Sequence, residues 1–181
     1  MALLPIIVAP DPRLKVKAEP VALVDNAVAK LMADMLDTMY IAPGVGLAAP
    51  QVGVAKQVIV VDAAPEKSKP QPIKLANPEI LWASEELFTY EEGCLSLPDE
   101  YEEVRRPAKI RVRYLDETNT VREIEAEGLL AVVLQHEIDH LSGVLFVDHL
   151  STLKRGIILR RLTKQKKTGA LDNERTFGLS S

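Results

Sequence analysis

The feature that most constrains this chain is the motif HEIDH at residues 136–140, which closes an apolar segment over residues 129–142. Apolar residues in this segment recur with helical spacing, and Gly143 ends the pattern. Residues four apart share one face of a helix, so the two imidazoles can bind a single metal ion. Glu137 stands one position further round, where it can exchange a proton with a metal-bound water. The alternative, two histidines that only face solvent or a partner, leaves this spacing unexplained.

The motif supplies two ligands, whereas a catalytic metal site usually has three protein ligands and one open position. In one class of metalloproteases a third histidine follows, but that position here is Phe146, and His149 comes three residues later. Asp148 remains possible just beyond the helix, and no further acidic residue occurs before Asp172. The best remaining donor is Cys94, because a thiolate with two imidazoles suits iron(II) or zinc. The alternative is a buried and inert cysteine.

Length and composition indicate one globular domain. The chain has 181 residues, of which 47% are hydrophobic and 27% are charged, and these values argue against disorder. A single cysteine excludes an internal disulfide framework and a zinc ribbon with several cysteines. The net charge of −4 does not mark a DNA-binding protein. No apolar run approaches the ~20 residues of a membrane span, and no signal or transit peptide is recognisable, so we expect a cytoplasmic protein without membrane contact.

The order of the expected elements favours an α+β fold. A helix is expected over residues 25–40, because apolar residues recur there at intervals of three and four. Several β-type segments follow one another before the pattern returns to helices, which is typical of α+β proteins. We predict one domain over residues 1–167 and a flexible tail over residues 168–181. The strands are expected at residues 57–62, 74–83, 87–90, 109–115 and 121–126.

The last predicted helix, over residues 150–167, is basic. Residues 151–170 contain seven basic residues and no acidic ones, whereas residues 1–150 contain 14 basic and 24 acidic residues. This charge pattern fits either a solvated helix face or contact with an anionic partner such as RNA. The residues expected on the inner side of the helix are Leu153, Ile157, Ile158 and Leu162.

A third segment, GVGLAAPQ at residues 44–51, combines small residues with an amide. It does not fit a phosphate-binding loop, because the Lys-Ser/Thr pair is missing. Its small side chains would let the backbone approach a substrate closely, and Gln51 offers an amide donor for a developing oxyanion. The alternative is a simple turn.

Taken together and in this order, GVGLAAPQ (44–51), EGCLS (92–96) and QHEIDH (135–140) resemble the bacterial form of the peptide deformylase family. The resemblance extends over residues 5–167. It implies an α+β fold in which mixed or antiparallel sheets pack around the central helix that carries HExxH. It also implies a hydrolase that removes the N-terminal formyl group from the formyl-methionine of nascent polypeptides, giving formate and a free amine.

The resemblance further implies how the motifs share the chemistry. Cys94, His136 and His140 would hold the metal, which in this family is iron(II), with zinc, nickel or cobalt as substitutes. A metal-bound water would be the nucleophile, and Glu137 would move its proton to the leaving amine. The family expectation is a monomer.

Two groups of residues complete the implied site. The Gln51 side chain and the Leu95 N–H would bind the oxyanion. The matched substrate-contacting positions surround an apolar methionine pocket, and the first two would also pair with the extended peptide through their backbones. These positions are Val45, Gly46, Leu129, Val132 and Val133.

Other matched positions carry weaker expectations. Glu92 and Arg106 match a structural pair that ties the strand of Cys94 to its neighbour. Tyr101 stands where some relatives carry an arginine that contacts substrate, so affinity beyond the first residue is in question. Ribosome docking is expected through five residues of the basic helix: Lys154, Arg155, Arg160, Arg161 and Lys164.

Two other functions compete with deformylation. A zinc metalloprotease would use the same motif, but Phe146 and the missing downstream acid argue against it. A metal-binding, ribosome-associated protein without catalysis would be expected to lose Glu137 or Gln51, and both are present. Formate release from a formylated peptide, compared with cleavage of an unformylated one, discriminates among these functions.

Overall fold

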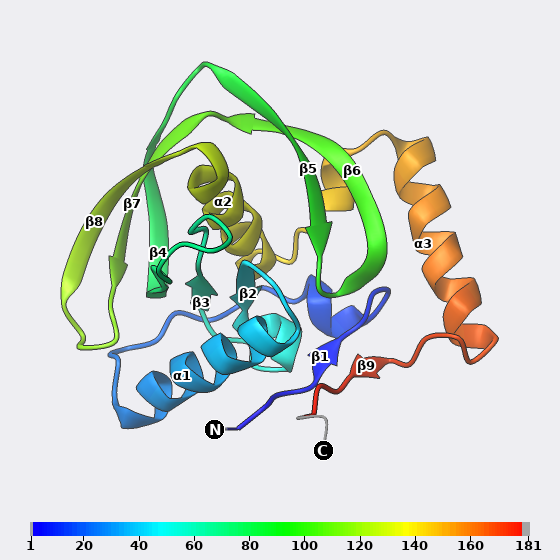
Figure 1. The fold of residues 1–181 in the computed structure, drawn as a ribbon, viewed down its shortest axis with the longest axis horizontal. Coiled ribbons are helices and arrows are strands. Elements are labelled where there is room, and N and C mark those ends of the chain that lie inside the picture. The colour runs from blue at the N-terminus through cyan, green and yellow to red at the C-terminus, as the bar shows by residue number, and fades with distance from the viewer. Residues whose placement is uncertain (1, 179–181) are drawn as a thin grey trace.

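The computed structural model describes residues 2–178 and confirms the α+β prediction (Figure 1). Within these residues, no helix combines the length and the apolar character needed to cross a membrane. Helix α2 (Gly128–Leu141) lies at the centre, α1 (Asn26–Ile41) covers the sheet from the opposite face, and α3 (Thr152–Lys167) lies on the outside. The short 3-10 helices are η1 (Pro12–Lys15), η2 (Ala49–Val52) and η3 (Phe146–His149).

The main sheet has five strands in the order β2-β3-β4-β7-β8, and all neighbours are antiparallel. Its strands are β2 (Gly46–Ala48), β3 (Val58–Val61), β4 (Ile73–Ala83), β7 (Lys109–Leu115) and β8 (Val121–Glu127). The four strands after β2 confirm the predicted segments. Strand β3 is apolar throughout because it is covered on both faces: Val58 and Val60 pack towards α1, whereas Ile59 and Val61 pack towards α2.

A second, two-stranded sheet is formed by β5 (Leu87–Cys94) and β6 (Leu97–Pro107), which arch over α2 in Figure 1. Strand β5 is longer than predicted, and β6 was not predicted. Strand β6 is rich in acidic and basic residues, so it lacks the apolar alternation that indicates a strand. In the structure, Arg106 of β6 points inward and pairs with other charged groups. A sequence pattern based on apolar residues does not indicate such a buried charge.

Helix α2 buries its apolar face against the main sheet. Ala131, Val133 and Leu134 pack with residues of β3, β4 and β7, so the motif at the end of the helix is carried into the interior. The helix ends where predicted, because Gly143 adopts a φ of 73°. A Cβ at this position would lie 2.5 Å from the carbonyl oxygen of Lys15, so the close approach of the N-terminal segment also requires glycine.

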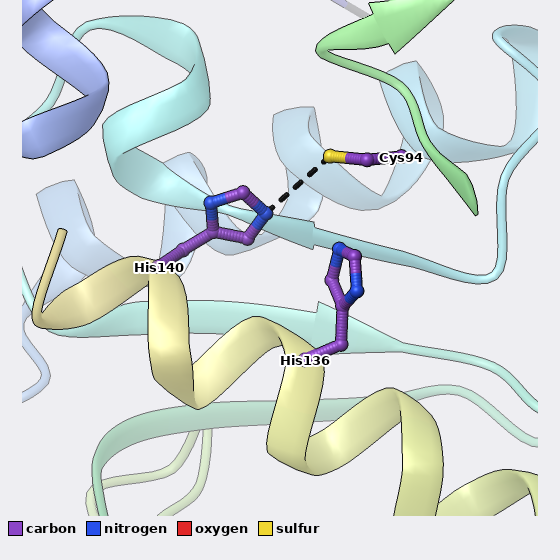
Figure 2. Close-up of side chains that lie close together, drawn as sticks. All are labelled: Cys94, His136 and His140. Atoms are coloured by element: carbon purple, nitrogen blue, oxygen red, sulfur yellow. Dashed lines mark hydrogen bonds between the residues drawn. The ribbon is translucent and has the colours of Figure 1, made fainter. Parts of the chain in front are cut away.

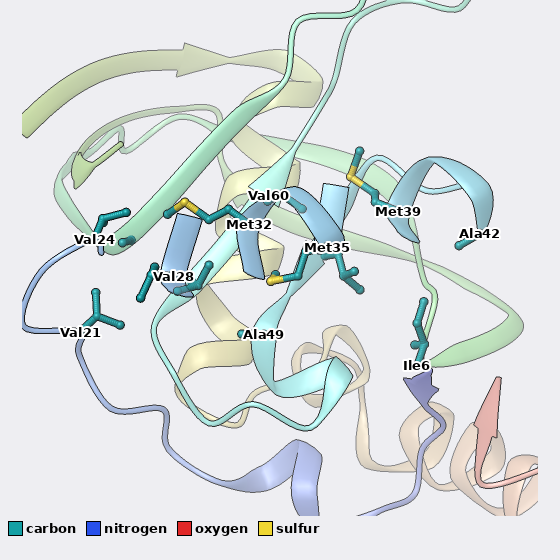
Figure 3. Packing of buried hydrophobic residues seen from close by; sticks show 13 residues of the cluster. Ile6, Val21, Val24, Val28, Met32, Met35, Met39, Ala42, Ala49 and Val60 are labelled. Carbon is teal, nitrogen blue, oxygen red and sulfur yellow. The ribbon is translucent and has the colours of Figure 1, made fainter. Parts of the chain in front are cut away.

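Helix α1 confirms the predicted helix at residues 25–40. Its N-cap is Asp25, whose side chain accepts a hydrogen bond of 2.9 Å from the Val28 N–H. Three fully buried methionines, Met32, Met35 and Met39, fill the space between the helix and the sheet (Figure 3).

Helix α3 confirms the predicted basic helix but corrects its inner side. Ile158 and Leu162, four residues apart, are buried against η3 and β6. Leu153 and Ile157 were predicted to be buried and are instead 69% and 42% exposed. The helix packs through a narrow stripe, in which Ile158 and Leu162 are buried and Leu159 is partly buried against the same cluster.

The C-terminal segment differs from the flexible tail expected over residues 168–181. Its described part contains β9 (Glu174–Arg175), which pairs antiparallel with β1 (Ile6–Ile7). Phe177 packs against the cluster that α1 forms with the sheet. Residues 179–181 lie outside the described part of the chain. Strands β1 and β9, from opposite ends of the described chain, therefore lie side by side, as Figure 1 shows.

Candidate metal centre and substrate cleft

The three predicted metal ligands meet between the end of β5 and helix α2. The Sγ of Cys94 and ring nitrogens of His136 and His140 all lie within 4.8 Å of one another. Figure 2 shows both imidazoles rising from α2 towards the thiol, and Nε2 of His140 lies 3.5 Å from Sγ. A register shift between Gly93 and Cys94 breaks the β5–β6 ladder at this point, so the cysteine turns towards the helix.

These residues fit a divalent metal ion. His140 is 1% exposed, and burial holds its pKa well below the ordinary value, so its imidazole stays in the neutral form that binds metals. Its Nδ1 is buried without a hydrogen-bond partner among the described residues. One thiolate and two imidazoles make a soft donor set suited to iron(II) or zinc. Three ligands leave one coordination position open for chemistry.

A carboxylate behind the cluster holds His136 in place. Oε1 of Glu92 lies 2.9 Å from Nδ1 of His136, which leaves Nε2 facing the other two ligands. Arg106 donates to both oxygens of Glu92, at 2.7 and 2.9 Å, and to Asp139 at 2.8 Å. Burial alone would raise the pKa of Glu92, but the hydrogen bonds from His136 and Arg106 outweigh it and lower the pKa. The Glu92–Arg106 pair therefore joins β5 to β6 and also holds the imidazole of His136.

The other acidic and histidine candidates lie outside the cluster. His149 lies 2.8 Å from Asp139 through Nε2 and is partly exposed. Asp148 pairs with Lys15 at 2.7 Å and with Arg155 at 2.8 Å. Both residues are therefore engaged in other contacts, and Cys94 is the residue that lies beside the two histidines of the motif.

Glu137 is buried beside the predicted metal ligands. Its Oε2 has no hydrogen-bond partner among the described residues, and burial raises its pKa to about 7. A carboxyl group with such a pKa can both accept and release a proton near neutral pH. Strand β2 crosses directly over it, because a Cβ added to Gly46 would lie 2.5 Å from Oε1 of Glu137. A side chain at position 46 would therefore displace the carboxylate.

Gln51 links the segment 44–51 to the turn after Cys94. Its Oε1 accepts from the Ala48 N–H at 2.9 Å, which orients the amide. Its Nε2 donates to Oγ of Ser96 at 3.1 Å and lies 3.5 Å from Sγ of Cys94. The segment forms β2 and the start of η2, so it is more than a simple turn. Ser96 was not predicted as a site residue, and only its place two residues after the cysteine hinted at it.

A cleft of about 470 Å³ opens beside the cluster. The cleft is lined by all of the predicted substrate-contacting residues and by most of the predicted catalytic and metal-binding residues. Gln51 and His140 are not among the lining residues, but both lie next to Cys94. The apolar wall of the cleft includes Leu129 and the buried residues Val132 and Val133. The other predicted residues that line it are Val45, Gly46, Cys94, Leu95, His136 and Glu137.

Tyr101 and Arg175 are among the other residues that line the cleft. Tyr101, 61% exposed, faces Gly93 across the β5–β6 hairpin, and a Cβ at Gly93 would lie 2.5 Å from its ring. Arg175 comes from the C-terminal segment, and its Nη1 donates to the carbonyl oxygen of Leu95 at 3.0 Å. Sequence reasoning missed Arg175, because no local pattern tells where a two-residue strand will pair.

Comparisons with known proteins agree with this geometry. A family model described as polypeptide deformylase matches residues 3–156. The chain is 60% identical over 178 residues to a peptide deformylase of Methylocella silvestris, covering 97% of this chain and 91% of the relative. It is similar to the crystal structure of the Ehrlichia chaffeensis peptide deformylase, with a TM-score of 0.89 and 38% identity over 94% of this chain and 100% of that one. The same organism's enzyme in complex with actinonin gives a TM-score of 0.88 and 40% identity, covering 92% and 99%.

Proposed function

Because the chain belongs to the polypeptide deformylase family, we propose that the residues gathered around Cys94 carry out that family's reaction. The protein is a metal-dependent hydrolase of protein biosynthesis. It removes the N-terminal formyl group from formyl-methionyl nascent peptides and releases formate and a free amine. The observation that carries the assignment is the cluster of Cys94, His136 and His140, with the buried Glu137 beside it, at a cleft with an apolar wall.

Cys94, His136 and His140 would hold the metal ion. When bound, the ion supplies a Lewis acid that polarises the formyl carbonyl and makes water more acidic. We propose iron(II), because the thiolate makes the donor set soft and electron-rich and iron(II) readily accepts an additional ligand. Equal turnover of fully loaded iron and zinc forms would contradict this choice, and anaerobic metal analysis with activity per bound ion measures it.

Glu137 is proposed to carry the proton. It takes a proton from the attacking water and delivers it to the nitrogen of the leaving amine. Its burial supports this role, because a pKa of about 7 lets the carboxyl act in both directions. Its unpartnered Oε2 leaves an oxygen free for this exchange.

Two donors are proposed to bind the oxyanion of the tetrahedral intermediate. One is Nε2 of Gln51, held between Ser96 and Cys94. The other is the N–H of Leu95, which bonds to no acceptor among the described residues. Fixed donors of this kind stabilise charge that develops only during the reaction.

The methionine side chain is proposed to occupy the apolar part of the cleft at Leu129, Val132 and Val133. The peptide would extend along Val45 and Gly46. Strand β2 is the outer strand of the main sheet, so one of its edges has no strand partner among the described residues. An extended peptide can add to such an edge through backbone hydrogen bonds.

Ribosome docking is proposed through part of α3. Three of the five expected cations are engaged within the protein: Arg155 with Asp148, Arg161 with Glu100 and Lys154 with Glu102. Arg160 and Lys164 form no ion pair among the described residues, so they carry the proposal for an RNA surface.

Charge reversal at Arg160 and Lys164 should weaken co-sedimentation with ribosomes and leave turnover of a free peptide unchanged. Unchanged co-sedimentation would refute the docking role. Deleting the whole region after residue 150 is a poorer test, because it also removes Arg175 from the cleft. We further propose a cytoplasmic monomer, in line with the similarity to bacterial proteins named peptide deformylase. Sedimentation equilibrium tests the monomer.

The reaction is tested by formate release from formyl-Met-Ala-Ser, with anaerobically purified protein of known metal content. The parent should release formate rapidly, whereas Glu137→Ala should lose activity while it retains metal. An unformylated peptide of the same sequence should stay intact. Cleavage of that peptide would favour the protease, and a folded, metal-loaded parent without either activity would favour the non-catalytic protein.

A further inference from the structure

The turn that carries Leu95 has few bonds of its own. Cys94 pairs with Leu97, so Leu95 and Ser96 form a two-residue connection between β5 and β6. The peptide groups of such a turn take no part in the hydrogen bonds between the two strands. Their orientation therefore depends on hydrogen bonds to other segments. An oxyanion donor must nevertheless point in a fixed direction, since its effect depends on pre-organisation.

Three other segments hold this turn. Nε2 of Gln51 donates to Oγ of Ser96 at 3.1 Å, and the Ala9 N–H donates to the carbonyl oxygen of Ser96 at 2.8 Å. Nη1 of Arg175 donates to the carbonyl oxygen of Leu95 at 3.0 Å. Of these contacts, only the last acts on Leu95 itself.

Arg175 is itself held in place. It belongs to β9 and pairs with Ile6 of β1, so its backbone is part of a ladder. Its guanidinium lies 5.0 Å from the ring centre of Phe177, which is packed against the cluster that α1 forms with the sheet. A planar guanidinium that rests on an aromatic ring loses little freedom when it donates to an oxygen in front of it.

We propose that Arg175 is a positioning residue for deformylation: its hydrogen bond to the Leu95 carbonyl fixes the turn so that the Leu95 N–H meets the oxyanion. The inference rests on the proposed role of Leu95. Arg175 lies beyond residue 156, where the match to the family model ends, so that match does not include the residue. The bond is charge-assisted, which makes it stronger than a neutral one.

The expected effect falls on the chemical step. Loss of a whole oxyanion donor costs about 10²–10³ in kcat, so a loosened donor should cost about tenfold. Arg175→Met, which keeps an unbranched side chain but removes the donor, should therefore lower kcat about tenfold. KM should change by less than about twofold, because the lost interaction belongs to the transition state.

The experiment uses the full chain and two forms of one substrate. Formyl-Met-Ala-Ser is assayed with a free C-terminal carboxylate and as its C-terminal amide, with kcat expressed per bound metal ion. Thermal unfolding of each variant sets an assay temperature below its transition. Glu174→Gln is the matched control, because Glu174 lies in the same strand and only pairs with Arg13 on the exposed side.

The proposal predicts equal losses of kcat on both peptides for Arg175→Met and parental kinetics for Glu174→Gln. Arg175→Lys, which keeps a charged donor without the planar fork, should give an intermediate kcat. Parental kcat in Arg175→Met overturns the proposal. A KM increase confined to the free-acid peptide also overturns it, because Arg175 would then bind the substrate carboxylate. Failure of the parent itself to release formate would contradict the proposed function instead.

Discussion

Glu92 and His136 form a buried carboxylate–imidazole pair, with Oε1 2.9 Å from Nδ1. The pair defines which nitrogen of the imidazole faces the other ligands. A carboxylate on one ring nitrogen fixes the tautomer and the ring orientation, and makes the other nitrogen a better ligand. Arg106 holds the carboxylate from behind, so the orientation is set by a connected group of charges.

Glu92→Gln should weaken metal binding. The neutral amide holds His136 less firmly, and loss of such a partner typically lowers metal affinity about 10–100-fold. Competition with a chelator of known affinity measures the change. Glu103→Gln, an exposed position of the same hairpin, should bind metal like the parent. Unchanged affinity in Glu92→Gln would show that the pair serves stability alone.

Gly46→Ala should lower turnover without loss of metal. The new Cβ would lie 2.5 Å from Oε1 of Glu137 and would displace the carboxylate. Misplacement of a catalytic group by about 1 Å can cost about 100-fold in rate. Steady-state kinetics with metal analysis measure this effect.

The matched control for that variant is Gly156→Ala in α3, where the nearest atom to an added Cβ is the flexible Arg160 guanidinium at 3.4 Å. It should keep parental turnover and gain about 0.5–1 kcal/mol of stability against urea, because alanine is the better helix former. Parental turnover in Gly46→Ala would mean that Glu137 tolerates the shift.

Asp116 should make stability depend on pH. The Arg122 guanidinium and the Thr118 hydroxyl hold its pKa well below the ordinary value of 3.8. The ionised carboxylate also accepts from the N–H groups of Thr118 and Thr120, at 2.9 and 3.0 Å. A pKa lowered by folding contributes stability above about pH 4, and this contribution is lost as the pH falls towards the folded-state pKa.

Asp116→Ala should therefore be about 1–3 kcal/mol less stable than the parent at pH 7, and the difference should shrink at pH 3. Urea unfolding at both pH values measures it. Glu117→Ala, the exposed neighbour, serves as the control and should follow the parent at both. A difference that is the same at pH 7 and pH 3 would exclude the carboxylate as its source.

Metal removal should lower both activity and thermal stability. The three ligands meet only in the folded chain, so a bound ion stabilises it by about 2.7 kcal/mol at a free concentration of about 100 Kd. Chelation should lower the Tm and stop formate release, and added iron(II) should restore both. A Tm that stays constant after complete metal loss would mean that the unfolded chain binds the ion equally well.

Much of the fold could be predicted where the local pattern is strong. The strands at 58–61 and 109–115 and the helix at 128–141 carry apolar residues at the spacing of their structure. Strand β6 was missed because its inward residues include Glu100 and Arg106, which find partners only in the folded protein. The prediction for the inner side of α3 was right for two of its four residues and wrong for Leu153 and Ile157. Periodicity does not show how wide a face of the helix the neighbouring elements will cover.

The candidate site divides in the same way. The two histidines came from a motif of fixed local spacing and Cys94 was the best remaining donor, and the three residues do meet in the structure. The contacts of Ser96 with Gln51 and of Arg175 with Leu95 join distant segments, and nothing local in the sequence announces them. Arg175 also belongs to the segment over residues 168–181, for which the sequence predicted only a flexible tail.

The pairing of β1 with β9 sets an order of events during the protein's own synthesis. Strand β1 is translated well before β9, so the two can pair only after residues 174–175 have left the ribosome. Until then the Leu95 carbonyl has no arginine partner. On the proposal for Arg175, a newly made chain therefore orders this turn of its active site fully only once β9 has paired with β1.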